Sequence, residues 1–249
     1  MSDPVFLGEL ADPLPGPGDR IELTGDEGHH AAVVRRIGVG DVVVIGDGHG
    51  RGVRGAVVAA GRRGITVEVT EHLTHPEPAL RITAVQALAK GTRGELAVEV
   101  MTEAGVHRIV PWSAQRSMLR WTGDRAAKSL RRWRSTAREA AKQSRRLRVP
   151  AVTEAVDTAA LVELLGTADR SFVLHEEAVD PLSATIPGGL TGDVLIIVGP
   201  EGGIAPDELA HLTGAGAVPV LLGDGVLRTS TAGVVAIAQL QALAGAARA

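Results

Sequence analysis

The N-terminal part of the chain has the hydrophobic pattern of short strands separated by tight turns. β-Branched runs occupy Arg20–Thr24, Val42–Ile45, Val53–Val58 and Ile65–Val69, and glycine-containing turns lie between them. One stretch, from about Glu27 to Ile37, has apolar residues at helical spacing instead. Several short strands with one helix predict a small β-barrel.

A different pattern begins after a proline-containing linker at residues 74–79, so we predict one domain over 1–73 and a second over 80–249. The second domain contains apolar runs typical of buried strands at Ile82–Leu88, Arg108–Pro111, Ser171–Leu174, Val194–Val198 and Val218–Leu222. Helical patterns alternate with them at Glu95–Ala104, Asp124–Arg146, Pro206–Thr213 and Ser230–Ala247. This alternation predicts an α/β domain with a largely parallel sheet.

Aliphatic side chains must form the core, because the 249 residues include only two Phe, three Trp and no Tyr. The absence of Cys excludes a disulfide framework and a cysteine-based zinc site. The acidic, proline-rich N-terminus lacks the features of a secretory signal, and the apolar run Val234–Ala238 is too short to span a bilayer. We therefore expect a soluble cytoplasmic protein without a membrane partner.

Basic residues are concentrated in one segment, although the net charge of the chain is −3. From Arg116 to Arg148 there are twelve Lys or Arg and only two acids, a local charge of +10 that leaves −13 for the rest of the chain. Such a segment fits a phosphate-binding face on an otherwise acidic protein. A long solvated helix with its charges in water is the alternative.

A glycine-rich turn follows one predicted buried strand. The apolar run Val194–Val198 leads into Gly199–Gly203, and a helix begins near Pro206. Glycine lets backbone groups approach a ligand, and ligands bind at the carboxyl ends of parallel strands. The turn matches neither the P-loop nor the G-x-G-x-x-G pattern. It is a candidate ligand site, and a plain strand-to-helix turn is the alternative.

A second glycine-rich turn, Leu222–Thr229, also connects a predicted buried strand to a helix. We expect the two glycine-rich turns to converge on one crevice at the strand ends. A third strand end, at Leu174, is a further candidate wall of this crevice, with His175 contributing backbone contacts only. Arg228 precedes the helix cap and is predicted to face the crevice, with an ion pair to Asp224 as the alternative. A doubly wound nucleotide-binding fold would carry its glycine-rich turn after the first strand, so we expect another α/β architecture.

The loop after another predicted strand, Arg108–Pro111, carries Arg116 and Ser117 and opens into the basic segment. Both residues suit phosphate groups. In the following helix, basic residues recur at spacings of three or four: Arg131, Arg134, Arg138, Lys142 and Arg145. His29 and His30 point about 100° apart on a helix and have no further ligands nearby, so no metal site is predicted.

Several stretches of the chain, in order and covering almost its whole length, form one set of motifs: Gly28-His29-His30, Val34-Arg35-Arg36, Gly46-Asp47-Gly48, Lys90-Gly91 with Glu95, Glu103-Ala104-Gly105-Val106, Gln115-Arg116-Ser117, Arg138–Ser144, Gly199-Pro200-Glu201-Gly202-Gly203, Leu222-Gly223 and Leu227-Arg228-Thr229. Together these motifs resemble those of the RsmE family, bacterial methyltransferases of the SPOUT superfamily that modify uridine N3 in small-subunit ribosomal RNA.

The resemblance implies a PUA-like N-terminal barrel and a SPOUT-type α/β domain with a trefoil knot, a rare exception to unknotted topology. S-adenosyl-L-methionine (SAM) would be the methyl donor, bound by Leu174, His175, Val198, Gly199, Pro200, Gly202, Gly203, Leu222, Gly223, Val226, Leu227 and Thr229. The 16S rRNA of the small ribosomal subunit would be held by Arg35, Arg36, Arg116, Ser117, Arg138, Lys142 and Arg145. The family also implies a homodimer and requires no metal.

Methylation of uracil N3 removes the ring proton and leaves negative charge on the ring. We predict that Arg228 stabilises this charge. Glu201 is the candidate base, with a role as a hydrogen-bond acceptor in its loop as the alternative. The chain lacks the Arg that many relatives carry beside Phe6, and Ser230 stands where many have Glu, so neither group contributes here.

Two other functions remain open from the sequence. One is a SPOUT methyltransferase that acts on a ribose 2'-hydroxyl or on transfer RNA. A non-catalytic RNA-binding protein would use the barrel and the basic helix without binding SAM.

Overall fold

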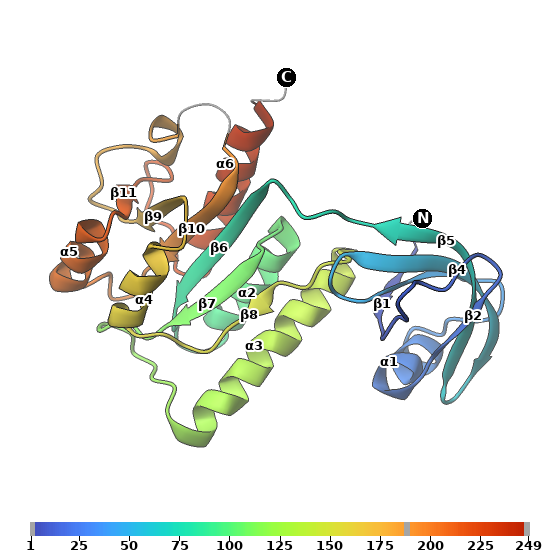
Figure 1. Ribbon diagram of the computed structural model, residues 1–249. Coiled ribbons are helices and arrows are strands. Elements are labelled where there is room, and N and C mark those ends of the chain that lie inside the picture. Colours follow the sequence, from blue (N-terminus) through green and yellow to red (C-terminus); the bar gives the residue numbers. More distant parts are fainter. Residues whose placement is uncertain (1–2, 187–189, 247–249) are drawn as a thin grey trace. The chain divides into compact units, whose positions relative to one another are not determined.

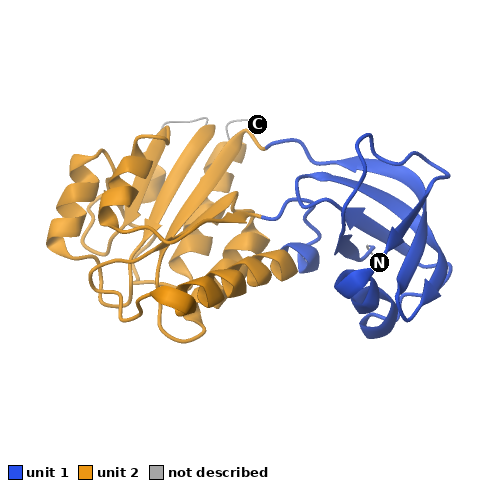
Figure 2. Cartoon of the chain, turned by 60° about the horizontal axis from the view of Figure 1, so that its bottom comes forward, with its two compact units in different colours: residues 1–77, 141–149 blue, residues 78–140, 150–249 orange. Residues whose placement is uncertain are grey.

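The computed structural model describes residues 3–186 and 190–246, which form two compact units (Figures 1 and 2). Unit 1 runs to Glu77 and resumes at Ala141–Val149, and unit 2 contains Pro78–Ala140 and the chain from Pro150 onward. The first boundary lies within the linker predicted at 74–79. None of the helices in the described ranges has the length and apolar character needed to cross a bilayer.

Unit 1 is built on a five-stranded sheet with the strand order β1-β3-β4-β5-β2. The strands are β1 (Val5–Leu7), β2 (Arg20–Leu23), β3 (Val42–Gly46), β4 (Arg51–Gly61) and β5 (Gly64–Thr74). β1 pairs in parallel with β3, and the other neighbours are antiparallel. The four predicted strands are confirmed. β1 was not predicted because three residues are too few for an alternation of period two to be recognised.

The predicted helix at Glu27–Ile37 begins two residues earlier, ends three residues earlier and has two parts. Helix α1 (Gly25–His29) continues into a single π-helical turn, η1 (His30–Val34), and Arg36 then adopts a left-handed conformation with φ of 56°. This segment covers an apolar core that includes Phe6, Ile45 and Val67.

Residues 141–149 pack in unit 1, although the sequence pattern assigns them to the second domain. Leu147 is buried against Val5 and Val44. Its carbonyl accepts a hydrogen bond from Gly50 N–H at 3.0 Å, and a Cβ on Gly52 would lie 3.1 Å from its Cδ2. The glycine-rich turn between β3 and β4 therefore receives this returning segment, a pairing that local sequence patterns do not predict.

Unit 2 contains a parallel six-stranded sheet in the order β11-β9-β10-β6-β7-β8. Its strands are β6 (Leu80–Ala87), β7 (Arg108–Trp112), β8 (Ala151–Val152), β9 (Arg170–Leu174), β10 (Gly192–Val198) and β11 (Val218–Val220). Helices alternate with them: α2 (Arg93–Ala104), α3 (Gly123–Gln143), α4 (Thr158–Leu165), η2, a 3-10 turn (Leu182–Ala184), α5 (Pro206–Gly214) and α6 (Ala232–Ala246). The predicted parallel α/β architecture is confirmed.

The helices cover both faces of this sheet (Figure 1). Leu195 and Ile197 of β10 point into a cluster with Leu161 of α4 and Leu212 of α5. The opposite face packs against α2 and α6, which approach so closely that a Cβ on Gly233 would lie 2.5 Å from Met101 Sδ. Apolar cover on both faces explains why these strands are continuous hydrophobic runs.

Two helices end or begin differently from the sequence expectation. The basic helix α3 ends at Gln143 rather than Arg146, since Arg145 adopts a left-handed φ of 57°. The last helix begins at Ala232 rather than Ser230, and its predicted end at Ala247 lies outside the described residues. Helix α4 and strand β8 were not predicted, because both are short and carry little periodicity.

Candidate functional site

A cavity of about 910 Å³ opens at the carboxyl ends of β9, β10 and β11 in unit 2. Parallel α/β sheets place ligands at this end of the strands. Both glycine-rich turns and the end of β9 form its wall. All twelve residues predicted to contact a cofactor line the cavity: Leu174, His175, Val198, Gly199, Pro200, Gly202, Gly203, Leu222, Gly223, Val226, Leu227 and Thr229.

The turn after β10 is shaped by two of its glycines. A Cβ on Gly199 would lie 2.8 Å from Ile204 Cγ1, and Gly203 has a left-handed φ of 72°. Gly203 N–H donates to the carbonyl of Pro200 at 2.9 Å and closes the turn. Helix α5 then begins with Pro206 in its first turn. Gly199, Gly202 and Gly203 carry no side chain, so at these three positions the backbone of the turn stays open toward the cavity.

A buried hydrogen-bond network joins the two glycine-rich turns. Thr229 Oγ1 donates to the carbonyl of Gly199 at 2.7 Å, and Gln86 Nε2 donates to Thr229 Oγ1 at 3.1 Å. Gln86 lies at the end of β6 and is fully buried. The network therefore fixes the start of one turn against the end of the other. Gln86 was missed by the sequence analysis, although an amide side chain in the apolar run Ile82–Leu88 is a usable signal.

Glu201 lies on the cavity wall, but its carboxylate is held by neighbouring donors. Its Oε1 accepts from Lys90 N–H and from Arg93 Nη1, both at 3.1 Å. Burial acts to raise the pKa of Glu201, but hydrogen bonds from its own backbone, Lys90 and Arg93 together hold that pKa below its usual range. A carboxylate with a lowered pKa stays ionised at neutral pH and is a weak proton acceptor.

Three guanidinium groups and, besides Glu201, three carboxylates share the cavity wall: Arg93, Arg116, Arg228, Glu176, Glu177 and Asp224. Arg116 Nη1 donates to the carbonyl of Gly202 at 3.3 Å. Arg228 is exposed, and among the described residues its guanidinium forms no ion pair, including the one with Asp224 that the sequence left open. Arg228 thus offers all of its donors to a bound molecule.

The predicted RNA contacts fall into two groups by exposure. Arg35, Arg36, Arg116 and Arg145 are exposed, and Arg138 is half-buried. Ser117 is buried, and so is Lys142, whose ammonium lies 2.8 Å from the Glu27 carboxylate. The spacing of basic residues in α3 could not predict that Lys142 is buried, because its partner Glu27 is 115 residues away in the sequence.

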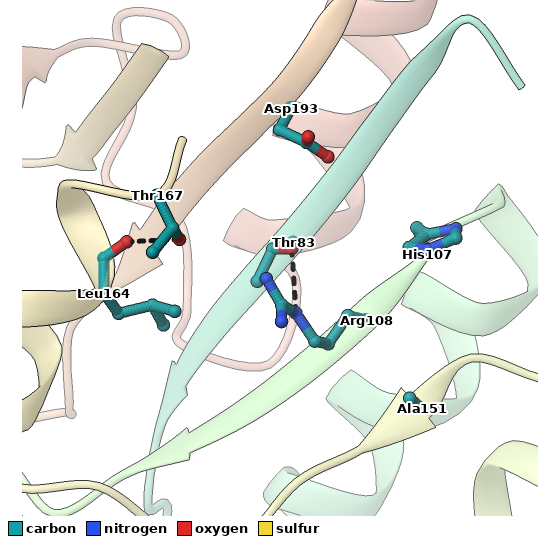
Figure 3. A pocket seen from close by; sticks show the side chains of 7 residues that line it. All are labelled: Thr83, His107, Arg108, Ala151, Leu164, Thr167 and Asp193. Carbon is teal, nitrogen blue, oxygen red and sulfur yellow. Dashed lines mark hydrogen bonds between the residues drawn. The ribbon is translucent and has the colours of Figure 1, made fainter. Parts of the chain in front are cut away.

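A second, smaller cavity of about 400 Å³ lies at the opposite edge of the same sheet (Figure 3). Arg108 Nε donates there to Thr83 Oγ1 at 3.3 Å, and Asp193 is paired with Arg81. Because these residues stand at the amino ends of β6, β7 and β10, this cavity is not at the usual ligand-binding end. Within the described residues no cluster of His, Cys, Asp and Glu has the arrangement of a metal site.

The chain matches two protein families along its length. The RNA methyltransferase domain covers residues 75–241, and the RNA methyltransferase PUA domain covers residues 23–70. The parallel sheet with its glycine-lined cavity is thus the catalytic domain of an RNA methyltransferase, and unit 1 contains its PUA domain.

Relatives narrow this class to one family. Ribosomal RNA small subunit methyltransferase E of Mycobacterium bovis is 48% identical over 230 residues, which cover 91% of this chain and 87% of the relative. The Bacillus subtilis protein of the same name is 29% identical over 227 residues, 88% of each chain. The chain belongs to the ribosomal RNA small subunit methyltransferase E family, as the sequence motifs indicated.

Solved structures agree with this assignment. Ribosomal RNA small subunit methyltransferase E from Neisseria gonorrhoeae, bound to S-adenosyl methionine, has a TM-score of 0.85 and 26% identity over 97% of this chain and 98% of its own. A methyltransferase from Legionella pneumophila with bound SAM has a TM-score of 0.86 and 27% identity, over 97% and 98%. The predicted fold class, an α/β methyltransferase domain preceded by a PUA-like domain, is confirmed. The trefoil knot stays a prediction.

Proposed function

We propose that this protein transfers the methyl group of SAM to N3 of a uridine in the 16S rRNA of the small ribosomal subunit. The observation that carries the proposal is the single cavity at the carboxyl ends of β9, β10 and β11, where both glycine-rich turns meet Arg116 and Arg228. We further propose that the enzyme acts in the cytoplasm as a homodimer, and that its α/β domain is knotted, as the family resemblance implies.

The residues of the cavity suit SAM. Its volume of about 910 Å³ lies in the range of small-molecule sites. Leu174, Val198 and Leu222 offer apolar surface for a purine ring, and the carboxylates of Glu176 and Asp224 suit hydroxyl groups and positive charge. When bound, SAM supplies an electrophilic methyl group and leaves as a neutral thioether.

Arg228 is proposed to stabilise the reacting uracil. The N3 proton passes to bulk solvent, its loss spreads negative charge over the two ring carbonyl oxygens, and a cation placed there stabilises that charge. The Arg228 guanidinium meets this requirement, since it is exposed on the cavity wall and unpaired among the described residues. The RNA backbone is proposed to contact Arg116 and Arg138 of unit 2 and, separately, Arg35, Arg36 and Arg145 of unit 1. The buried Ser117 and Lys142 are left out of these proposed contacts.

Glu201 is proposed to position its loop rather than to accept the proton. Its hydrogen bonds to Lys90 and Arg93 join the turn after β10 to the start of α2. The lowered pKa of Glu201 also makes it a weak base for the N3 proton, which uracil retains at neutral pH.

Replacing Glu201 with glutamine is expected to lower kcat by less than about tenfold, whereas loss of a general base costs about 10²- to 10⁴-fold. Because the folded-state pKa is lowered, the stability that Glu201 contributes is present above its unfolded pKa and is lost as pH falls. The difference in Tm between the parent and E201Q should therefore narrow in acid. The exposed Glu163 of α4 offers a matched control, E163Q. A larger loss of kcat with a changed pH–rate profile would restore Glu201 as the base.

The proposed reaction is tested with purified protein, SAM and small ribosomal subunits from a strain that lacks the gene. Nucleoside digestion and mass spectrometry should then find 3-methyluridine in the 16S rRNA and none without the protein. A 2'-O-methylated nucleoside, or methylation of transfer RNA instead, would replace this function with the other SPOUT activities. No SAM binding by titration calorimetry would indicate a non-catalytic RNA-binding protein.

A further inference from the structure

A buried carboxylate outside the cavity connects three segments of unit 2. Glu208, in the first turn of α5, has no exposed surface. Its Oε1 accepts from Gln115 N–H at 2.9 Å and from Thr158 Oγ1 at 2.6 Å, and its Oε2 accepts from Ala205 N–H at 3.4 Å. No Lys or Arg pairs with it in the described part of the chain. Neutral donors and the amino end of α5 are what hold it there.

The donors come from elements that are distant in sequence. Thr158 begins α4, and its hydroxyl also accepts from the indole of Trp112 at the end of β7, at 3.3 Å. Gln115 lies on the loop after β7, 93 residues before Glu208. Figure 1 shows α4 and α5 on the same side of the sheet. One carboxylate therefore joins the end of β7 and the start of α4 to the helix that follows the turn after β10.

The loop that Glu208 holds is the one that carries Arg116. Asp207, the neighbour of Glu208, accepts a second hydrogen bond from the side chain of Gln115 at 2.6 Å. The next residue, Arg116, lies on the cavity wall with its guanidinium against Gly202. A Cβ on Gly202 would lie 3.3 Å from both Cβ and the carbonyl oxygen of Arg116, so the two loops are in close contact.

We propose that Glu208 is a positioning residue that sets Arg116 against the cofactor turn, so that the RNA backbone enters in register with the methyl donor. This inference rests on the proposed function. Helix α5 follows the turn Gly199–Gly203 directly, so its first turn moves with the cofactor site. The hydrogen bond from Gln115 N–H to Glu208 fixes the loop that carries Arg116 relative to the first turn of α5. Glu208 touches neither substrate and acts through Arg116.

Two conservative variants separate the reach of the side chain from its charge. In Glu208→Gln, the amide oxygen keeps its reach to Gln115 N–H and the Thr158 hydroxyl. In Glu208→Asp, the charge remains but the side chain is one methylene too short. We expect E208D to raise KM for 16S rRNA by about tenfold or more, E208Q by less than about threefold, and neither to change Kd for SAM by more than about threefold.

A double-mutant cycle with Arg116→Ala tests whether Glu208 acts through Arg116. In the R116A background, E208D should change KM for RNA by less than about twofold, because the group it positions is absent. Three outcomes would each overturn the inference. The increases in KM for RNA caused by E208D and R116A could multiply in the double variant, R116A could keep the parent KM, or the Kd for SAM could rise together with KM for RNA. The parent enzyme is assayed first, so a missing methylation product would count against the proposed function instead.

Discussion

Arg228→Ala is expected to lower kcat for rRNA methylation by about 10²- to 10³-fold, the usual cost of removing one preorganised donor from a developing anion. The Kd for SAM should stay within about threefold, because the cofactor contacts proposed for Thr229 and the glycine-rich turns do not involve this guanidinium. The uracil ring becomes negatively charged only as its proton leaves, so the lost stabilisation falls on kcat. Single-turnover kinetics with saturating RNA measures the chemical step directly.

Two further variants make this result specific to Arg228. Arg228→Lys keeps the charge but loses the planar guanidinium, and should recover only part of the rate. Arg170→Ala removes an equally exposed arginine at the amino end of β9, the edge of the sheet opposite the cavity, and should leave kcat unchanged. A kcat for R228A within about threefold of the parent would reject its role in catalysis.

The second large effect is expected at the network beneath the cavity. Thr229→Val keeps the shape of the side chain but removes its hydroxyl, which donates to Gly199 and accepts from Gln86. Two buried polar partners would then lose a hydrogen bond, at a cost of about 1–3 kcal/mol in stability. Because both turns depend on this link, the affinity for SAM should fall about 10- to 100-fold. Titration calorimetry with SAM and thermal unfolding provide the two measurements.

Thr231→Val is the matched control for this substitution. Thr231 Oγ1 donates to the carbonyl of Arg228 at 3.3 Å, in a half-buried position, so its loss should change SAM affinity by less than about threefold. If T229V bound SAM as tightly as T231V, the two turns would be held by their backbones alone and the network would have no part in cofactor binding.

Local patterns were enough to predict most elements of this fold. The apolar runs that became β6, β7, β9 and β10 are buried on both faces, and such strands are recognisable from hydrophobicity alone. The glycine-rich turns were recognisable because glycines between a buried strand and a helix are typical of a backbone that approaches a ligand. The elements missed, β1, β8, α4 and the 3-10 turn η2, are short and show little periodicity.

Local patterns did not predict which side chains of the basic segment are buried, or in which unit the end of that segment packs. Helical spacing placed Lys142 and Arg138 on one basic face, yet Lys142 is buried beside Glu27. The return of residues 141–149 to unit 1 depends on Leu147 reaching the turn between β3 and β4, and no pattern within either segment shows it.

The sequence by itself determined the α/β class, the two glycine-rich turns and the arginines beside them, because strand burial, turn chemistry and charge are properties of neighbouring residues. Only the tertiary structure decided that the turns meet in one cavity, that Gln86 joins them through Thr229, and that Glu208 holds the loop of Arg116. Gln86 and Thr229 are 143 residues apart, and Gln115 and Glu208 are 93 apart. Contacts over such separations form only when the parallel sheet brings the carboxyl ends of its strands together.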